Sequence, residues 1–310
     1  MNLQQYKSIS EPEHQLLGGV KVELRNIYTA DNARLALSRI KPRNENPLSV
    51  PVILVHGSYS TRGFWISDRG VGLGVYLADQ GFDVWIPELR GHGLSPKGDS
   101  FSKITAEDQI RYDLPAVQDA VFSATGMPAF WIGHSFGGLF ILAALSAGWL
   151  DQGKMKSLVT FGSQISLGDR YLKIPPLAWT LTALLRWMGN FPAPRFSLGP
   201  EIESAGTMIE TIDWKKFRGR WANSEGVSYW EGLGKIKIPV MTYAAADDKN
   251  DPPAGCRKIH KRLGSTDKMF MVLGKDAGFS KDYDHIGMVV SKEAQKEVWP
   301  DLSGWLKDRI

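Results

Sequence analysis

The sequence has little cysteine: among its 310 residues only Cys256 carries a thiol. One cysteine cannot form a disulfide within the chain, and it cannot supply a cluster of thiolate ligands. We expect neither a bound metal nor another cofactor. Cys256 lies near the start of a predicted helix, where we expect it to be buried and structural.

Charge of one sign is also scarce. The formal net charge is +4, and the Lys and Arg residues are spread along the chain. The densest basic run, residues 215–220, is short and lies between Trp214 and Trp221. Nucleic-acid binding needs a longer or denser basic patch, so we expect no nucleic-acid partner and interpret this run as a solvated face.

No export signal is visible at the N-terminus. The first 17 residues, "MNLQQYKSISEPEHQLL", are polar and lack the apolar segment of a secretory signal. We therefore expect a cytoplasmic protein. The sequence also shows no internal repeat and no low-complexity linker.

One stretch lacks charge entirely: residues 129–150 contain no Asp, Glu, Lys or Arg. Its length and apolarity approach those of a membrane-spanning helix. However, Gly133, Gly137 and Gly138 interrupt its first half, which favours a short buried strand followed by a buried helix. We expect no membrane span; contact with a lipid surface is left open.

The order of predicted elements indicates the fold class. Residues 20–28 and 33–40 alternate in polarity around a turn and predict a β-hairpin. Further strands are predicted at 50–57, 82–88, 129–133, 155–163, 238–248 and 267–274. Helices are predicted at 70–81, at 106–126 with Pro115 as an interruption, at 135–149, and from about Pro253 and Ser291. Strands that alternate with helices predict an α/β fold with a mostly parallel, doubly wound sheet.

One region breaks this alternation. Between about residues 164 and 235 no strand is predicted, residues 174–191 have the pattern of an amphipathic helix, and five of the eleven Trp residues occur here. We interpret residues 165–235 as an inserted helical cap. Residues 1–164 and 236–310 then form the core.

The motif Gly133-His134-Ser135-Phe136-Gly137 lies between the strand and the helix of the charge-free stretch. A sharp strand-to-helix turn with serine at its apex exposes the hydroxyl, and it needs small residues two positions before and after. The motif therefore predicts Ser135 as a nucleophile. The alternative is a serine that only caps the helix.

A serine nucleophile needs a general base and an acid that orients the base. Of the two histidines after Ser135, His260 lies mid-helix among basic residues, where a surface position is expected. His285 lies in a loop before the last helix and is the predicted base. For the acid we favour Asp248, with Asp247 as the alternative. Asp251, after Asp248, is interpreted as a turn or capping residue.

Two further loops, those of Ser58 and His92, follow predicted strands at the same edge of the sheet. The backbone N–H groups of Phe136 and Ser58 are predicted to bind an oxyanion. His56 is interpreted as a structural histidine that holds its loop. His92 precedes Ser135 in the chain, which argues against it as the general base, so we interpret it as a residue that stabilises its turn.

These motifs together resemble the α/β-hydrolase-fold serine hydrolases. The residues that carry the likeness are "LVHG", "ELRGHGLS", "GHSFGG", the Asp after "IPVMTYAAA", and "DHIGM". Residues 63–93 also resemble the acid lipase family, and "RGHGLS" resembles the monoacylglycerol lipases. The resemblance implies an α/β-hydrolase fold with a lid and a carboxylic ester hydrolase of the carboxylesterase or lipase type.

The cap is rich in apolar side chains, which favours an ester with an apolar acyl group over a peptide. We expect this group to lie under the cap, near Tyr59, Trp179, Leu184 and Trp187. Thioesterase and aminopeptidase activities remain alternatives within the same fold. A non-catalytic protein that keeps the ligand pocket is a second class of function.

Overall fold

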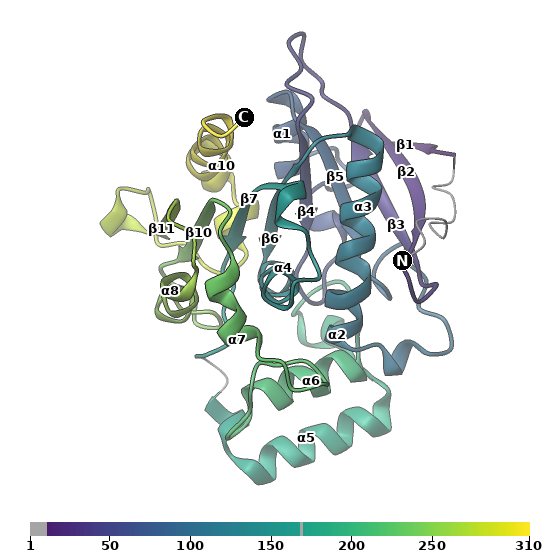
Figure 1. The fold of residues 1–310 in the computed structure, drawn as a ribbon, viewed down its shortest axis with the longest axis vertical. Helices are drawn as coiled ribbons and strands as arrows, with labels where there is room; N and C mark the ends of the chain where they lie inside the picture. The colour runs from purple at the N-terminus through teal and green to yellow at the C-terminus, as the bar shows by residue number, and fades with distance from the viewer. Residues whose placement is uncertain (1–10, 168–169) are drawn as a thin grey trace.

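The computed structural model describes residues 11–167 and 170–310. Its centre is a nine-stranded sheet in the order β1-β2-β3-β5-β4-β6-β7-β10-β11, with helices on both faces (Figure 1). The strands are β1 (Glu13–Leu17), β2 (Val20–Tyr28), β3 (Arg34–Ile40), β4 (Pro51–Val55), β5 (Asp83–Glu88), β6 (Ala129–His134), β7 (Met155–Phe161), β10 (Val240–Ala245) and β11 (Lys268–Leu273).

The sheet is parallel from β5 to β11 and antiparallel from β1 to β5. The predicted hairpin is confirmed as β2 and β3. Strand β1 was not predicted, because four of its five residues are exposed and three of them are polar. By contrast, every residue of β4, β5 and β6 is buried, which explains their nearly continuous apolar sequences.

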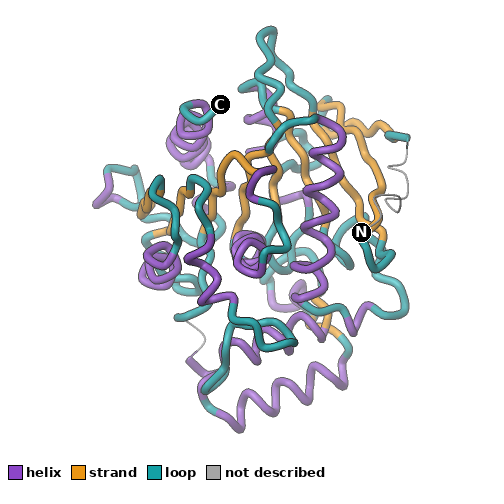
Figure 2. Tube along the Cα trace, viewed as in Figure 1, coloured by secondary structure: helices purple, strands orange, loops and turns teal. Residues whose placement is uncertain are grey.

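Ten α-helices are present in the described part of the chain (Figure 2). They are α1 (Leu73–Asp79), α2 (Ala106–Asp108), α3 (Leu114–Thr125), α4 (Phe136–Ala147), α5 (Pro175–Met188), α6 (Ala205–Lys215), α7 (Tyr229–Gly232), α8 (Pro253–Arg262), α9 (Gly287–Val290) and α10 (Lys292–Lys307). Residues of α3, α4 and α8 share one hydrophobic core, and residues of α1, α9 and α10 share another. The sheet is therefore covered on both faces.

The helix predicted over residues 106–126 is not continuous. A π-helical turn, Gln109–Asp113, separates α2 from α3, and Pro115 lies in the first turn of α3. The prediction placed the interruption at Pro115, which was wrong, because proline is tolerated in a first helical turn. The π-helical turn buries Asp113, whose carboxylate accepts hydrogen bonds from the backbone and the guanidinium of Arg90.

The segment between β7 and β10 carries α5, α6 and α7. It also contains two short antiparallel strands, β8 (Asn190–Phe191) and β9 (Glu203–Ser204). The expectation of no strand in this region was therefore wrong, because two-residue strands have no detectable periodicity.

Helices α5 and α6 lie together at one end of the sheet (Figure 1). They share a small apolar cluster of their own. Tyr229 of α7 instead joins the main core together with Trp214 and Trp221. Part of the segment therefore packs on itself, and its last part packs on the body of the protein.

Candidate active site

Ser135 occupies a sharp turn between β6 and α4. Its φ is 53° and its ψ is −122°, a conformation that non-glycine residues rarely adopt. A Cβ atom on Gly133 would lie 2.4 Å from the Cα atom of Gly138, and one on Gly137 would lie 2.4 Å from the carbonyl oxygen of Val55. Glycine is therefore required at both positions for this turn to form.

The loops after β10 and β11 bring Asp248 and His285 together. His285 Nδ1 donates a hydrogen bond to Asp248 Oδ2 over 2.6 Å. The other carboxylate oxygen of Asp248 accepts hydrogen bonds from the backbone N–H groups of Asn250 and Asp251. Asp248 is buried, so these bonds hold its carboxylate in one orientation toward the imidazole.

Asp247, the alternative acid, points elsewhere. Its side chain is 59% exposed and lies 3.8 Å from the ammonium group of Lys249. Its backbone N–H donates a hydrogen bond to the carbonyl oxygen of Tyr283. The geometry therefore favours Asp248 as the partner of His285.

His134 links the turn of Ser135 to the loop of His285. The Nε2 atom of His134 lies 2.9 Å from the carbonyl oxygen of His285, and the two rings lie 4.6 Å apart. Burial, together with the charge of His285, lowers the pKa of His134 well below its usual value, so its ring is neutral. A neutral ring with hydrogen on Nε2 can donate to this carbonyl group. The motif did not indicate this role of His134.

The net shift of the pKa of His285 has the opposite direction. Burial lowers the pKa of His285, but the hydrogen bond to Asp248 and the charges of Asp251, Asp248 and Asp284 raise it above its usual value. Within the described residues, no hydrogen bond joins Ser135 Oγ to His285. Such bonds are often long in free enzymes and shorten when substrate binds.

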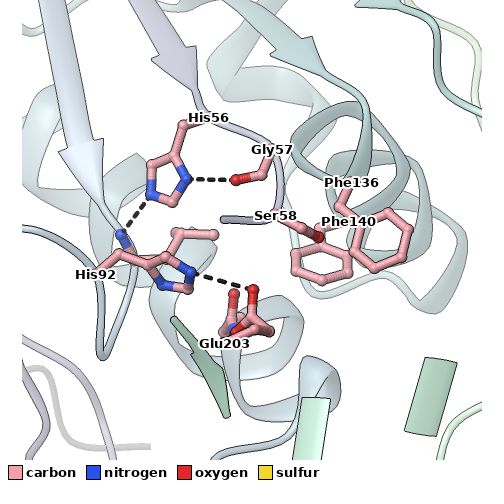
Figure 3. A pocket seen from close by; sticks show the side chains of 9 residues that line it. His56, Gly57, Ser58, His92, Phe136, Phe140 and Glu203 are labelled. Carbon is pink, nitrogen blue, oxygen red and sulfur yellow. Dashed lines mark hydrogen bonds and ion pairs between the residues drawn. The ribbon is translucent and has the colours of Figure 1, made fainter. Parts of the chain in front are cut away.

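The predicted oxyanion donors line a cavity of about 10 Å³ (Figure 3). Ser58 and Phe136 contribute to its wall, and the hydroxyl group of Ser58 is buried without a hydrogen-bond partner in the described part of the chain. His56 holds the loop of Ser58: its Nδ1 contacts the carbonyl oxygen of Gly57, and its Nε2 accepts from the backbone N–H of Leu89.

Burial and the charge of His92 lower the pKa of His56 to about 3. His56 is therefore neutral and structural, as the sequence indicated. His92 contacts its own turn at the carbonyl oxygen of Arg90, and its Nε2 lies 3.2 Å from the carboxylate of Glu203 in β9 (Figure 3). The sequence indicated only a role within the turn. Glu203 is 111 positions away in the chain, so no local pattern marks it.

Two basic positions differ from the sequence expectation. His260 was expected at the surface, yet it is buried beside Thr242, whose Oγ1 lies 3.0 Å from His260 Nδ1. Lys215 was placed on a solvated face, yet it is buried with its ammonium group 5.6 Å from the ring centre of Phe136. Both side chains lie on the inward faces of helices. Their sequence neighbours are charged, so the local sequence suggested exposed positions. Cys256 is buried, as expected.

Three of the four expected substrate contacts lie elsewhere. Trp179, Leu184 and Trp187 are 68%, 45% and 85% exposed, so they are not enclosed beneath the cap. Helix α5 instead buries Ala178 and Leu185, which lie seven positions apart on its opposite stripe. The sequence showed an amphipathic helix but did not show that its bulky aromatic side chains face outward.

Tyr59 contacts the segment between β7 and β10. Its φ of 59° is positive, its carbonyl oxygen accepts from the backbone N–H of Glu201, and its ring lies 5.5 Å from that of Phe191. Tyr59 directly follows Ser58, one of the predicted oxyanion donors, so its expected role as a substrate contact stays a prediction. A larger cleft of about 780 Å³ lies apart from the residues described above, between α2, α6 and the loop at 220–226.

The described residues contain neither a membrane-spanning helix nor a cluster of metal-binding side chains. No helix has the length and apolarity that crossing a membrane requires. No group of three or more His, Cys, Asp or Glu side chains is arranged to hold a metal ion within residues 11–167 and 170–310.

The chain is similar to several lipases. A tear acid lipase-like protein from Mesocricetus auratus is 36% identical over 142 residues, which cover 41% of this chain and 35% of that protein. Triacylglycerol lipase 2 from Arabidopsis thaliana is 30% identical over 214 residues, which cover 63% of this chain and 49% of that protein. The chain thus spans between about a third and half of the length of these relatives.

Solved structures show the same fold. A soluble variant of monoglyceride lipase from Saccharomyces cerevisiae superposes with a TM-score of 0.67 at 19% identity, covering 100% of this chain and 98% of that one. The α/β-hydrolase fold expected from the sequence is confirmed. Residues 52–299 match the alpha/beta hydrolase family. The chain therefore belongs to the alpha/beta hydrolase family.

Proposed function

We propose that this protein is a serine hydrolase that cleaves carboxylic esters through Ser135, His285 and Asp248. The observation that carries the proposal is the bond of 2.6 Å between His285 and a buried, fixed carboxylate. His134, which directly precedes Ser135 and its strained backbone, lies against His285. Strained backbone at an exposed nucleophile is a common feature of catalytic sites. The relatives named as lipases support ester hydrolysis.

In this mechanism the Ser135 oxygen attacks the ester carbonyl carbon while His285 Nε2 takes the serine proton. Asp248 stabilises the imidazolium that forms. Collapse of the tetrahedral intermediate expels the alcohol, which receives the proton from His285. A water molecule, deprotonated by His285, then attacks the acyl-serine, and the acid leaves as Ser135 regains its proton.

The oxyanion of each intermediate is bound by the backbone N–H groups of Ser58 and Phe136. Neither N–H donates a hydrogen bond within the described residues, so both can serve this purpose. His56 supports this role, because it ties the carbonyl group of Gly57 and thereby orients the next peptide.

We propose residues 165–235 as a cap over this site, with an apolar acyl group beneath it. The cavity beside the proposed oxyanion donors is lined by the apolar side chains of Leu89, Phe136 and Phe140. The cap contacts the loops after β4 and β5, where Glu201 meets Tyr59 and Glu203 meets His92. Glu203 of the proposed cap also lines this cavity, so core and cap residues meet beside the proposed oxyanion donors.

Labelling with a fluorophosphonate probe tests the function. We expect the probe to label the wild type and not Ser135→Ala, and we expect hydrolysis of p-nitrophenyl esters by the wild type alone. Esters of increasing chain length, with matched thioesters, would show which acyl group and leaving group are preferred. No labelling and no turnover of any ester would instead support a non-catalytic ligand-binding protein.

A further inference from the structure

Asp251 is a buried carboxylate that the mechanism above does not use. It lies three residues after Asp248 and just before α8. One of its oxygens, Oδ1, accepts a hydrogen bond of 2.7 Å from the side-chain amide of Gln164. The other, Oδ2, lies 3.7 Å from His285 Nε2. Its fixed orientation therefore directs one carboxylate oxygen toward the catalytic imidazole.

The imidazole of His285 thus lies between two carboxylates. Asp248 contacts Nδ1, the nitrogen that orients the ring, and Asp251 faces Nε2, the nitrogen that exchanges protons with Ser135 and the leaving alcohol. We propose that Asp251 is a positioning residue of the catalytic centre: it attracts the proton that His285 carries on Nε2 and so competes with Ser135 for this nitrogen. The proposal rests on the function proposed above.

The charges around His285 agree with this role. Asp248 and Asp251 face the ring, and their charges and that of Asp284 favour its protonated form, whereas His134, which lies against it, is neutral. Lys215 from α6 acts on Asp251: its charge, the charge of His285 and the amide of Gln164 oppose the burial that raises the pKa of Asp251. The charges of His285 and Asp251 therefore act on each other: Asp251 raises the pKa of His285, and His285 lowers the pKa of Asp251 against the effect of burial.

This arrangement affects the acid side of the pH profile. Below the pKa of His285 the imidazolium donates to Asp251 and cannot accept the proton of Ser135. Asp251→Asn removes one negative charge and keeps an oxygen for the amide of Gln164. The imidazolium then loses stabilisation, the pKa of His285 falls, and the neutral base persists to lower pH. We expect the acid limb to move down by about one pH unit.

The experiment compares kcat/KM for p-nitrophenyl butyrate from pH 5 to 9 in four proteins. These are the wild type, Asp251→Asn, Asp251→Glu and Asp247→Asn. Asp247→Asn is the matched control, because it removes a neighbouring charge that does not contact His285. We expect the shift in Asp251→Asn alone, and Asp251→Glu to keep the wild-type limb. We expect the kcat of Asp251→Asn on the pH-independent plateau to fall by less than about tenfold.

An unchanged limb in Asp251→Asn, or an equal shift in Asp247→Asn, would overturn the inference. If Asp251→Asn does not fold, Asp251→Ser provides the same comparison with a smaller oxygen acceptor. The rate of fluorophosphonate labelling against pH gives a second readout that needs no turnover. If Ser135→Ala hydrolyses esters like the wild type, the proposed function is wrong. If Ser135→Ala is inactive and the acid limb of Asp251→Asn is unchanged, only the proposed role of Asp251 is wrong.

Discussion

At Ser135 a half-buried serine has a strained backbone conformation. A positive φ at a residue with a side chain costs on the order of 1–3 kcal/mol, which the surrounding packing must supply. Two glycines leave room for this conformation, and the hydrogen bond from the Ser135 N–H to the carbonyl oxygen of Phe161 stabilises it. His134, directly before it, holds the loop of His285. The turn therefore links the position of Ser135, the proposed nucleophile, to that of His285, the proposed base.

Asp248 and Asp247 are adjacent in sequence, yet only Asp248 contacts His285. We expect Asp248→Asn to lower kcat by about 10³–10⁴-fold, because the imidazole loses its orientation and the stabilisation of its cation. We expect Asp247→Asn to change kcat by no more than about twofold, as for an exposed side chain without such contacts. Ester hydrolysis by the two variants, at equal thermal stability, measures this. A large loss in Asp247→Asn with a small loss in Asp248→Asn would contradict the assignment.

The pH dependence of the wild type follows from His285. It must be neutral to accept the serine proton, so activity falls as the pH drops through its pKa. Burial lowers this pKa, but Asp248, Asp251 and Asp284 raise it above 6.5. We expect the acid limb of kcat/KM to have its midpoint above pH 6.5. An activity maximum near pH 4–5 would show that another group acts as the base.

At the scale of elements, α6 joins the cap to the π-helical region of the core. Glu210 on α6 accepts a hydrogen bond from the backbone N–H of Glu107 in α2. The same helix ends in Lys215, which reaches toward Phe136 and Asp251. One helix thus contacts the wall of the 780 Å³ cleft and the surroundings of the catalytic centre.

Glu210 makes the stability of this contact depend on pH. Burial, with the charges of Glu107 and Asp108, raises the pKa of Glu210 to about 7 from an ordinary value of 4.5. A carboxyl group with a raised pKa in the folded state stabilises the fold below pH 4.5, and this stability is lost as the pH rises toward 7.

We expect Glu210→Gln to raise the free energy of unfolding at pH 8 by about 1–3 kcal/mol, with little change at pH 4.5. The amide oxygen of glutamine can still accept from Glu107, so the hydrogen bond is kept. Denaturant unfolding at both pH values measures the difference. Glu231→Gln, an exposed carboxylate on α7, serves as the control. Equal effects at both pH values would show that the change acts through packing and not through ionisation.

At the scale of the whole molecule, polar contacts around the proposed site join residues 165–235, the proposed cap, to the rest of the protein. Ser204 Oγ donates to the carbonyl oxygen of Ile104, and Glu203 pairs with His92 in the loop after β5. The outer side of α5 takes no part in these contacts. Its Trp side chains face away from the core, although the sequence suggested a pocket lining.

The double variant Trp179→Ser/Trp187→Ser tests this orientation. Because both rings are exposed, we expect kcat/KM for a short, water-soluble ester to stay within about twofold of the wild type. Loss of tenfold or more at unchanged thermal stability would place these side chains against the substrate after all. The same variant assayed on emulsified ester would show whether this outer face contacts a lipid surface.

Much of the core and the site could be predicted because their signals are local. A buried parallel strand needs apolar neighbours along its own length, and a turn around Ser135 needs glycine two positions away on each side. The position of His285 followed from a loop near the chain end. The strand pair in the cap and the π-helical turn could not be predicted, because each depends on a few residues whose partners are distant in the chain.

The sequence by itself determined the α/β sheet, the turn at Ser135 and the order in which Ser135, Asp248 and His285 occur. Only the tertiary structure decided which of two adjacent aspartates is buried against His285, that Asp251 faces its other nitrogen, and that Glu203 meets His92. The reason is physical. Neighbouring residues in a loop direct their side chains apart. Which of them is buried depends on elements that are far away in the chain.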